Sequence, residues 1–291
     1  MVRLNAGDVL DTITLGKSAA KRLATEKMIA RPVLTKEYAP FPVRIHTRVS
    51  TSVITARTGR IKPAAPFSRK AVAERITGKT KLIIVNSPSN PTGSVATAEQ
   101  MKAIAQIAED RDIAVLSDEV YEHFIYRGEH VSPARFSDNV ITVNAVSKTY
   151  AMTGWRLGYL GARGSALEQL LKIHQYVQAC ASSISQAAAL MAVSGPQNCV
   201  ALMRDEFRSR RDLLVNGFRD MGVDIIEPEG AFYLFPRVGD GDQVAARLGK
   251  GGVIVVPGSA FGPGGKEHIR ISYAAARPQL EEALRRMKDI L

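Results

Sequence analysis

The sequence predicts an α/β protein built on a mostly parallel β-sheet. Three apolar runs of strand length, rich in β-branched residues, follow one another at residues 81–86, 113–116 and 140–143. A segment with helical periodicity lies between the first two runs, and a polar segment follows each of the three. Strand, helix and strand at this spacing form a βαβ unit, whose strands lie parallel and whose crossover is right-handed.

Length and composition are those of an ordinary globular protein. The chain has 291 residues, of which 45% are hydrophobic and 23% charged, so it can bury a core in one large or two modest domains. No apolar run approaches the length of a membrane span, and the first residues lack a secretory apolar core, so we expect a cytoplasmic protein outside the membrane. Cys180 and Cys199 are expected to be buried, reduced thiols, and the five histidines have no metal-ligand spacing, so no metal is expected.

The net charge of +11 is concentrated near the N-terminus. The first 80 residues hold 16 Lys and Arg but 5 Asp and Glu, whereas the rest of the chain carries no net charge. A basic body that binds nucleic acid is therefore not expected. We expect an atypical basic segment over residues 1–60.

Local signals predict the elements around the three strands. Residues 87–93, SPSNPTG, form a turn after the first strand. Residues 97–100 have the form of a capping box, and apolar residues recur at helical spacing from 101 to 108. After the third strand, Lys148 is expected in a short polar loop, and residues 157–161 form a further strand.

The remainder of the chain predicts helices and a second group of strands. Helices are expected at 167–177, 187–193, 204–221 and 278–291, with an interruption at 182–185, and strands at 224–226, 232–235 and 269–273. We therefore expect a partial large domain over 61–194 and a small α+β C-terminal domain over 195–291.

Polar side chains follow the three predicted strands where each strand ends. The first strand delivers Asn90, the second Asp118 and Tyr121, and the third Lys148, while Arg156 begins the strand that returns from this edge. If the strands are parallel neighbours, these side chains meet where open α/β sheets bind their ligands. Each residue alone has an ordinary explanation as a turn former, a helix cap or a surface ion-pair partner, but their coincidence at one edge indicates a site.

The chemistry of this set suits pyridoxal phosphate. An amine that forms a Schiff base and a carboxylate that keeps a pyridine nitrogen protonated are what this cofactor needs as an electron sink. Tyr121 and Asn90 are candidate donors to its phenolate oxygen, and the planar guanidinium of Arg156 suits its phosphate.

Six sequence blocks carry a resemblance to a known family. They are SPSNPTG at 87–93, SDEVY at 117–121, SKTYAMTGWRLGY at 147–159, EGAFYLFP at 229–236, VPGSAFG at 256–262 and HIRISYA at 268–274. In this order, over residues 61–291, they resemble the class I and II aminotransferases of pyridoxal phosphate fold type I, of the aspartate aminotransferase kind. The resemblance implies a three-layer, mostly parallel sheet, a homodimer, and transfer of an amino group between an α-amino acid and a 2-oxo acid.

The same resemblance implies a role for each site residue. Lys148 is implied as the Schiff-base lysine and proton shuttle, and Asp118 as the partner of the pyridine nitrogen. Asn90 and Tyr121 are implied as donors to the phenolate oxygen, with Arg156 as a phosphate ligand. Arg270 is implied as the clamp for the substrate α-carboxylate, while Phe232, Tyr233 and Phe261 suit the core and a substrate lining equally well.

The N-terminal part departs from the family pattern. Relatives carry a small-residue phosphate loop and a stacking aromatic ahead of the SPSNPTG turn, and residues 1–80 contain neither. The large domain is therefore expected to be incomplete. Two alternatives to an active transaminase stay open: a truncated, catalytically impaired remnant, and a pyridoxal phosphate-dependent lyase or decarboxylase on the same fold.

Overall fold

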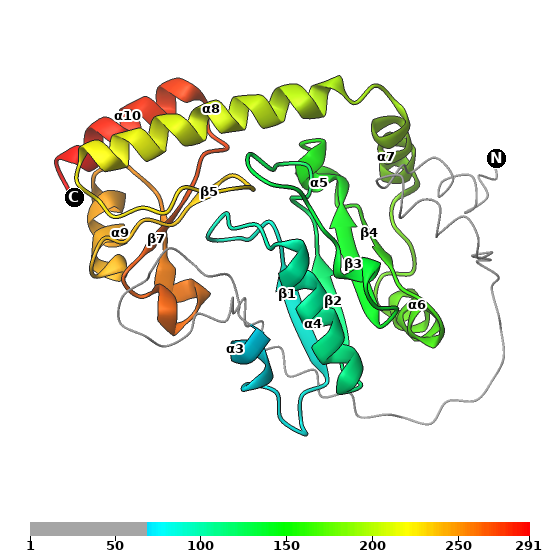
Figure 1. Cartoon of the computed structure of the whole chain (residues 1–291). Helices are drawn as coiled ribbons and strands as arrows, with labels where there is room; N and C mark the ends of the chain where they lie inside the picture. The colour runs from blue at the N-terminus through cyan, green and yellow to red at the C-terminus, as the bar shows by residue number, and fades with distance from the viewer. Residues whose placement is uncertain (1–68) are drawn as a thin grey trace.

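The computed structural model describes residues 69–291, which fold around two β-sheets (Figure 1). The expected basic segment 1–60 and the first residues of the expected domain 61–194 lie outside the described residues. Among the described helices, none is long and apolar enough to cross a membrane.

The first sheet has four strands in the order β1-β2-β3-β4. They are β1 Leu82–Asn86, β2 Ala114–Asp118, β3 Val140–Ala145 and β4 Gly158–Gly161. β1, β2 and β3 run parallel, with Asn86 opposite Asp118 and Asp118 opposite Val143, and β4 runs antiparallel to β3. The predicted parallel arrangement is confirmed, and the carboxyl ends of the first three strands meet at one edge.

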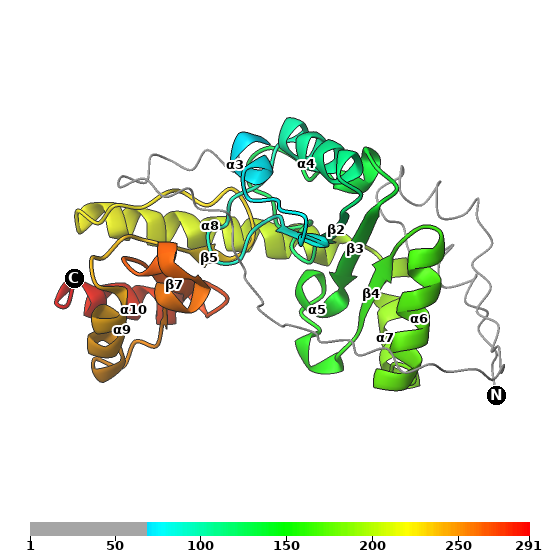
Figure 2. The same cartoon turned by 90° about the horizontal axis from the view of Figure 1, so that it is seen from below.

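Helix α4, Ala98–Asp110, covers one face of this sheet (Figures 1 and 2). It begins at the predicted capping box, in which the Thr97 hydroxyl accepts from the Gln100 amide and the Gln100 side chain accepts from the Thr97 amide. Buried Met101 and Ile104 of α4 share an apolar cluster with Val115 of β2. The short helices α3 (Arg69–Ala73) and η1 (Pro133–Arg135) contact α4.

Four helical segments follow β3. They are α5 Val146–Thr149, η2 Thr153–Trp155, α6 Ser165–Val177 and α7 Ser183–Ser194. Lys148 thus lies in a one-turn helix, and the expected loop at this position is wrong. The expected interruption at 182–185 lies earlier in the chain than predicted. The break in helical structure falls between the end of α6 at Val177 and the start of α7 at Ser183.

Helices α6 and α7 expose apolar side chains. No residue of α6 is buried, and the relative exposure of Tyr176 is 70% and that of Val177 is 76%. In α7, Ile184 and Met191 are exposed as well. Cys180 and Cys199 are free and exposed, so the expectation that both thiols are buried is wrong.

The C-terminal part contains an antiparallel sheet in the order β5-β7-β6. Its strands are β5 Tyr233–Leu234, β6 Val256–Pro257 and β7 Ile269–Ser272; its helices are α8 Asn198–Asp220, α9 Gly241–Lys250, η3 Gly258–Phe261, η4 Pro263–Gly265 and α10 Arg277–Lys288. The expected strand at 224–226 is wrong, because only an isolated bridge joins Asp224 to Arg237. Helix α8 runs from the side of α7 to α10 and links the two parts (Figure 1).

An aromatic cluster packs the end of β2 against α8 and the second sheet. Phe124 makes edge contacts with Phe207 of α8, at a centroid distance of 5.2 Å, and with Phe232, at 5.9 Å. Tyr121 makes a similar contact with Phe232 at 5.3 Å. Phe124 is 0% exposed, and burial of such a side chain stabilises the fold by about 1.5–3 kcal/mol. This cluster therefore holds the second sheet against the carboxyl edge of the first.

Candidate active site

The candidate site lies at the carboxyl ends of β1, β2 and β3. Asp118 is the last residue of β2, and its side chain accepts a hydrogen bond from the Val120 amide at 3.3 Å. Its backbone oxygen accepts from the Asn86 side chain of β1 at 3.2 Å. Because β3 passes directly into α5, Lys148 lies a few residues beyond the neighbouring strand end. The structure thus brings the predicted amine and carboxylate to one sheet edge.

Asp118 and Lys148 interact electrostatically. Burial raises the pKa of the Asp118 carboxyl, the negative charge of Glu119 adds to this rise, and the positive charge of Lys148 opposes it. Lys148 is itself half-buried, and its Nζ lies 5.9 Å from the centroid of the Phe232 ring. The site therefore holds an amine that interacts with a carboxylate and lies over an aromatic ring, partly shielded from water.

Asn90 connects the first sheet to the second. Its backbone amide donates to the Asn86 side chain at 2.7 Å, which fixes the turn after β1. Its Oδ1 accepts a hydrogen bond of 3.0 Å from Nη1 of Arg270, in β7. Arg270 is 180 residues further along the chain, so the packing of the two sheets alone brings this pair together.

Tyr121 is buried and bonded to another tyrosine. Its hydroxyl lies 2.8 Å from the hydroxyl of Tyr233 in β5, and burial raises its pKa, so the phenol stays protonated. Tyr233 also lies under the Arg270 guanidinium, with 4.8 Å between Cζ and the ring centroid. Tyr233 therefore belongs to the candidate site, a role that the sequence left open; the EGAFYLFP block was the signal that marked it.

Arg156 is placed differently from the other predicted residues. It is exposed, follows η2 with a left-handed backbone (φ 52°), and its Nη1 donates to the Thr153 carbonyl oxygen at 3.0 Å. In the described part of the chain, no hydrogen bond joins Arg156 to the other five predicted residues. Its guanidinium is thus bonded to its own turn, on an exposed part of the chain.

A partly buried ion-pair cluster lies beside the site and was not found from the sequence. Nε2 of His130 lies 3.1 Å from Glu119 and 3.9 Å from Glu122. Ser132 donates to Glu119 at 2.6 Å and Asn144 to Glu122 at 2.5 Å. Burial disfavours the charged imidazole, but the hydrogen bond and charge of Glu119 outweigh it and raise the pKa of His130. Although these ligand atoms lie within 4.8 Å of one another, each carboxylate already has protein donors, so the cluster is an ion-pair network.

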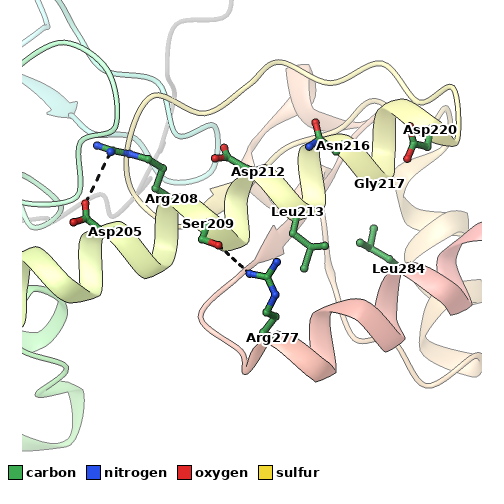
Figure 3. Close-up of a pocket in the computed structure, with 10 residues that line it drawn as sticks. All are labelled: Asp205, Arg208, Ser209, Asp212, Leu213, Asn216, Gly217, Asp220, Arg277 and Leu284. Atoms are coloured by element: carbon green, nitrogen blue, oxygen red, sulfur yellow. Dashed lines mark hydrogen bonds and ion pairs between the residues drawn. The ribbon is translucent and has the colours of Figure 1, made fainter.

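A groove of about 730 Å³ lies elsewhere, on α8 (Figure 3). Asp205, Asp212 and Asp220 of α8 line it, and Arg277 of α10 crosses it to donate to Ser209 at 2.9 Å. None of the predicted site residues lines this groove. It is a surface groove between two helices, separate from the sheet edge.

Comparisons with known proteins show the family to which the chain is similar. The sequence profile described as aminotransferase class I and II matches residues 53–287. A probable aspartate aminotransferase of Methanocaldococcus jannaschii is 49% identical over 228 residues, which are 75% of this chain and 60% of that protein. An aspartate aminotransferase of Pyrococcus abyssi is 43% identical over 74% of this chain and 58% of its own length.

Solved structures give the same result for the fold. The aromatic aminotransferase of Pyrococcus horikoshii superposes with a TM-score of 0.74 at 41% identity, over 77% of this chain and 63% of that one. The aspartate aminotransferase of Thermus thermophilus, solved with maleate, superposes with a TM-score of 0.73 at 36% identity, over 77% and 60%. The chain thus spans about three fifths of the length of these relatives.

Proposed function

The chain belongs to the class I and II aminotransferase family, whose members use pyridoxal phosphate, and from this premise we propose that it is a pyridoxal phosphate-dependent aminotransferase. It moves an amino group between an α-amino acid and a 2-oxo acid. The observation that carries the proposal is the meeting of Lys148, Asp118 and Arg270 at one sheet edge, the first two coupled electrostatically and the third held by Asn90.

Asp118 supports the fit of the cofactor to this site. Its carboxylate is partly buried, and burial raises its pKa because it disfavours the ionised form. A cation bound beside the carboxylate would offset this cost and stabilise the ionised form. A protonated pyridine nitrogen is such a cation. The cofactor, when bound, supplies an electron sink for the carbanion formed at the substrate Cα.

Lys148 and Asp118 have the central roles in this proposal. Lys148 would hold the cofactor covalently through Nζ, and its amine would accept the proton from the substrate Cα. Asp118 holds the proton on the pyridine nitrogen. Tyr121 and Asn90 donate to the phenolate oxygen; the raised pKa of Tyr121 keeps its hydroxyl a donor, with Tyr233 as its present partner.

Two arginines bind the anionic groups. Arg270 clamps the substrate α-carboxylate: one of its donors is bonded to Asn90, and its Nε is buried without a partner among the described residues. Arg156 binds the cofactor phosphate after releasing the Thr153 carbonyl. The fork geometry of both guanidinium groups suits planar and tetrahedral oxyanions better than an ammonium does.

The proposed organisation of the protein follows from the two sheets. They support a pyridoxal phosphate fold type I large domain over 61–194, with its sheet in a three-layer arrangement, and a small C-terminal domain over 195–291. The exposed apolar side chains of α6 and α7 support a homodimer, and the two free thiols suit a cytoplasmic location. Analytical ultracentrifugation tests this proposal. A monomeric protein at micromolar concentration would contradict it.

A catalytically impaired remnant is the second candidate function. Two observations favour it: the Arg156 guanidinium is bound to its own turn, and the chain matches only three fifths of its relatives. A phosphate held by one arginine is bound less tightly than one that also receives helix-terminal amides. In this case the protein folds but does not retain the cofactor.

A covalent trapping experiment separates the two functions. The full chain is titrated with pyridoxal phosphate, the absorption of bound cofactor is recorded, and borohydride then fixes the adduct for peptide mass spectrometry. A label on Lys148 that is lost in Lys148→Ala supports the aminotransferase. A folded protein, as judged by circular dichroism, without any label at saturating cofactor identifies the remnant.

A further inference from the structure

Two aromatic rings flank the Arg270 guanidinium. Its Cζ lies over the Tyr233 ring, 4.8 Å from the centroid, and over the Phe261 ring, 5.0 Å from the centroid. Tyr233 pairs with Ser272 across β5 and β7, so it is the diagonal neighbour of Arg270 on the same sheet face. Phe261 ends η3, which follows β6 on the other side of β7. The two rings therefore come from opposite sides of the strand that carries the arginine.

Both rings are themselves held in place. Phe261 packs its edge against Phe235 at 6.0 Å, and Phe235 stacks on the buried His268 with 6° between the ring planes. Tyr233 is buried, and its hydroxyl lies 2.8 Å from that of Tyr121. The two aromatic faces presented to Arg270 thus have fixed orientations before any ligand arrives.

Two ring contacts leave the N–H groups of the Arg270 guanidinium available for hydrogen bonding. A cation over an aromatic face is attracted by the ring quadrupole, and this contact uses none of the five in-plane N–H donors. On Arg270 one donor is bonded to Asn90, and Nε has no partner among the described residues. The rings and Asn90 together restrict the guanidinium, so a carboxylate binds it at a smaller entropic cost than it would bind a flexible side chain.

We infer that Tyr233 and Phe261 are positioning residues for the carboxylate clamp, acting through the Arg270 guanidinium. The inference rests on the proposed function for the role of Arg270, while the geometry of the three side chains stands without it. Phe261 is the better residue to change, because it is only partly buried, whereas Tyr233 also serves Tyr121 and the core.

The test compares Phe261→Leu, which removes the aromatic face, with Phe261→Tyr, which keeps it. The readout is the Arg270 Nε–H signal in ¹H–¹⁵N NMR spectra of the full chain, assigned by its loss in Arg270→Lys. Because Nε is buried, we expect its proton to exchange slowly with water, and a proton beside aromatic rings is shifted by their ring currents. Maleate, a dicarboxylate without an amine, is the binding probe, titrated with and without pyridoxal phosphate.

We expect Phe261→Leu to move the Arg270 signal and to weaken maleate binding roughly threefold to fivefold, because the guanidinium loses one of the two ring contacts that restrict it. Phe261→Tyr retains the wild-type signal and affinity. An unchanged signal and affinity in folded Phe261→Leu overturns the inference; if that variant does not fold, Phe261→Met provides the same comparison. If maleate does not bind the wild-type protein, Arg270 is not a carboxylate clamp and the proposed function fails in this respect. The NMR shift of the Arg270 signal in Phe261→Leu tests the positioning by the rings independently of that outcome.

Discussion

The joint between the two sheets depends on Phe124, and its truncation is the sharpest test of the fold. Phe124 is 0% exposed and makes edge contacts with Phe207 and Phe232. Truncation of a buried Phe to Ala costs about 3–5 kcal/mol, since both transfer free energy and packing are lost. In Phe124→Leu most of the apolar volume stays but two edge contacts of about 0.5–1.5 kcal/mol each are lost, so a loss of about 1–3 kcal/mol is expected.

Urea unfolding followed by circular dichroism measures both losses, with Ile254→Ala as the control. Ile254 is 94% exposed, so its truncation should change the free energy of unfolding by less than about 0.5 kcal/mol. In a protein of this size 1 kcal/mol corresponds to about 2–4 °C in Tm, so Phe124→Ala should lower Tm by about 6–20 °C.

A particular pattern of results would refute this reasoning. If Phe124→Ala destabilises the protein no more than Ile254→Ala, the aromatic cluster does not hold the sheets together. The meeting of Asn90 with Arg270 would then need another cause. If Phe124→Leu costs as much as Phe124→Ala, volume alone does not explain the packing, and the edge contacts dominate.

Three further predictions test individual parts of the structure. Lys148→Ala should abolish the borohydride-fixed label and leave the urea midpoint almost unchanged, because Lys148 is partly exposed; a retained label would contradict its role. The pKa of His130 is raised in the folded state, so its charged form stabilises the fold below the ordinary pKa of 6.5, and this stabilisation is lost as the pH rises through the folded-state pKa. The difference in free energy of unfolding between wild type and His130→Gln should therefore shrink above pH 6.5. A difference that stays constant with pH would disprove this role. In α9, Gly241→Ala should destabilise the protein by about 3 kcal/mol, because the added Cβ would lie 2.1 Å from the His268 carbonyl oxygen. Gly249→Ala adds a Cβ in open space and should stabilise the protein by about 0.5–1 kcal/mol. Thermal unfolding measures both changes, and equal effects would refute the contrast.

Much of the first sheet was predictable because its signals are local. The runs that became β1, β2 and β3 are short and apolar, and the capping box at Thr97 marks the start of α4. Parallel pairing follows once a helix separates two such strands. The convergence of Asp118 and Lys148 was therefore predictable from strand order alone.

Three errors in the prediction have physical causes: in one case a local signal was weak, and in two the outcome depends on neighbouring segments. Helix α9 was missed because it begins and nearly ends with glycine, although Asp240 caps it by accepting from the Gln243 amide. The apolar run 224–226 suggested a strand, but it forms only an isolated bridge, since strand formation depends on a partner. Cys180 and Cys199 suggested burial from residue type, whereas exposure depends on which face of a segment meets a neighbour.

The family and the parallel sheet could be read from residue order and short-range periodicity, and the same signals predict Lys148 and Asp118 as the amine and carboxylate of the site. Two contacts between distant segments depend on the packing of the whole chain: Arg270 with Asn90, 180 residues apart, and Tyr121 with Tyr233, 112 residues apart. The same is true of the exposure of Arg156 and of the two rings beside the Arg270 guanidinium. The physical reason is that such contacts arise when the aromatic cluster packs two sheets together, and a buried contact between distant segments leaves no periodic trace in either one.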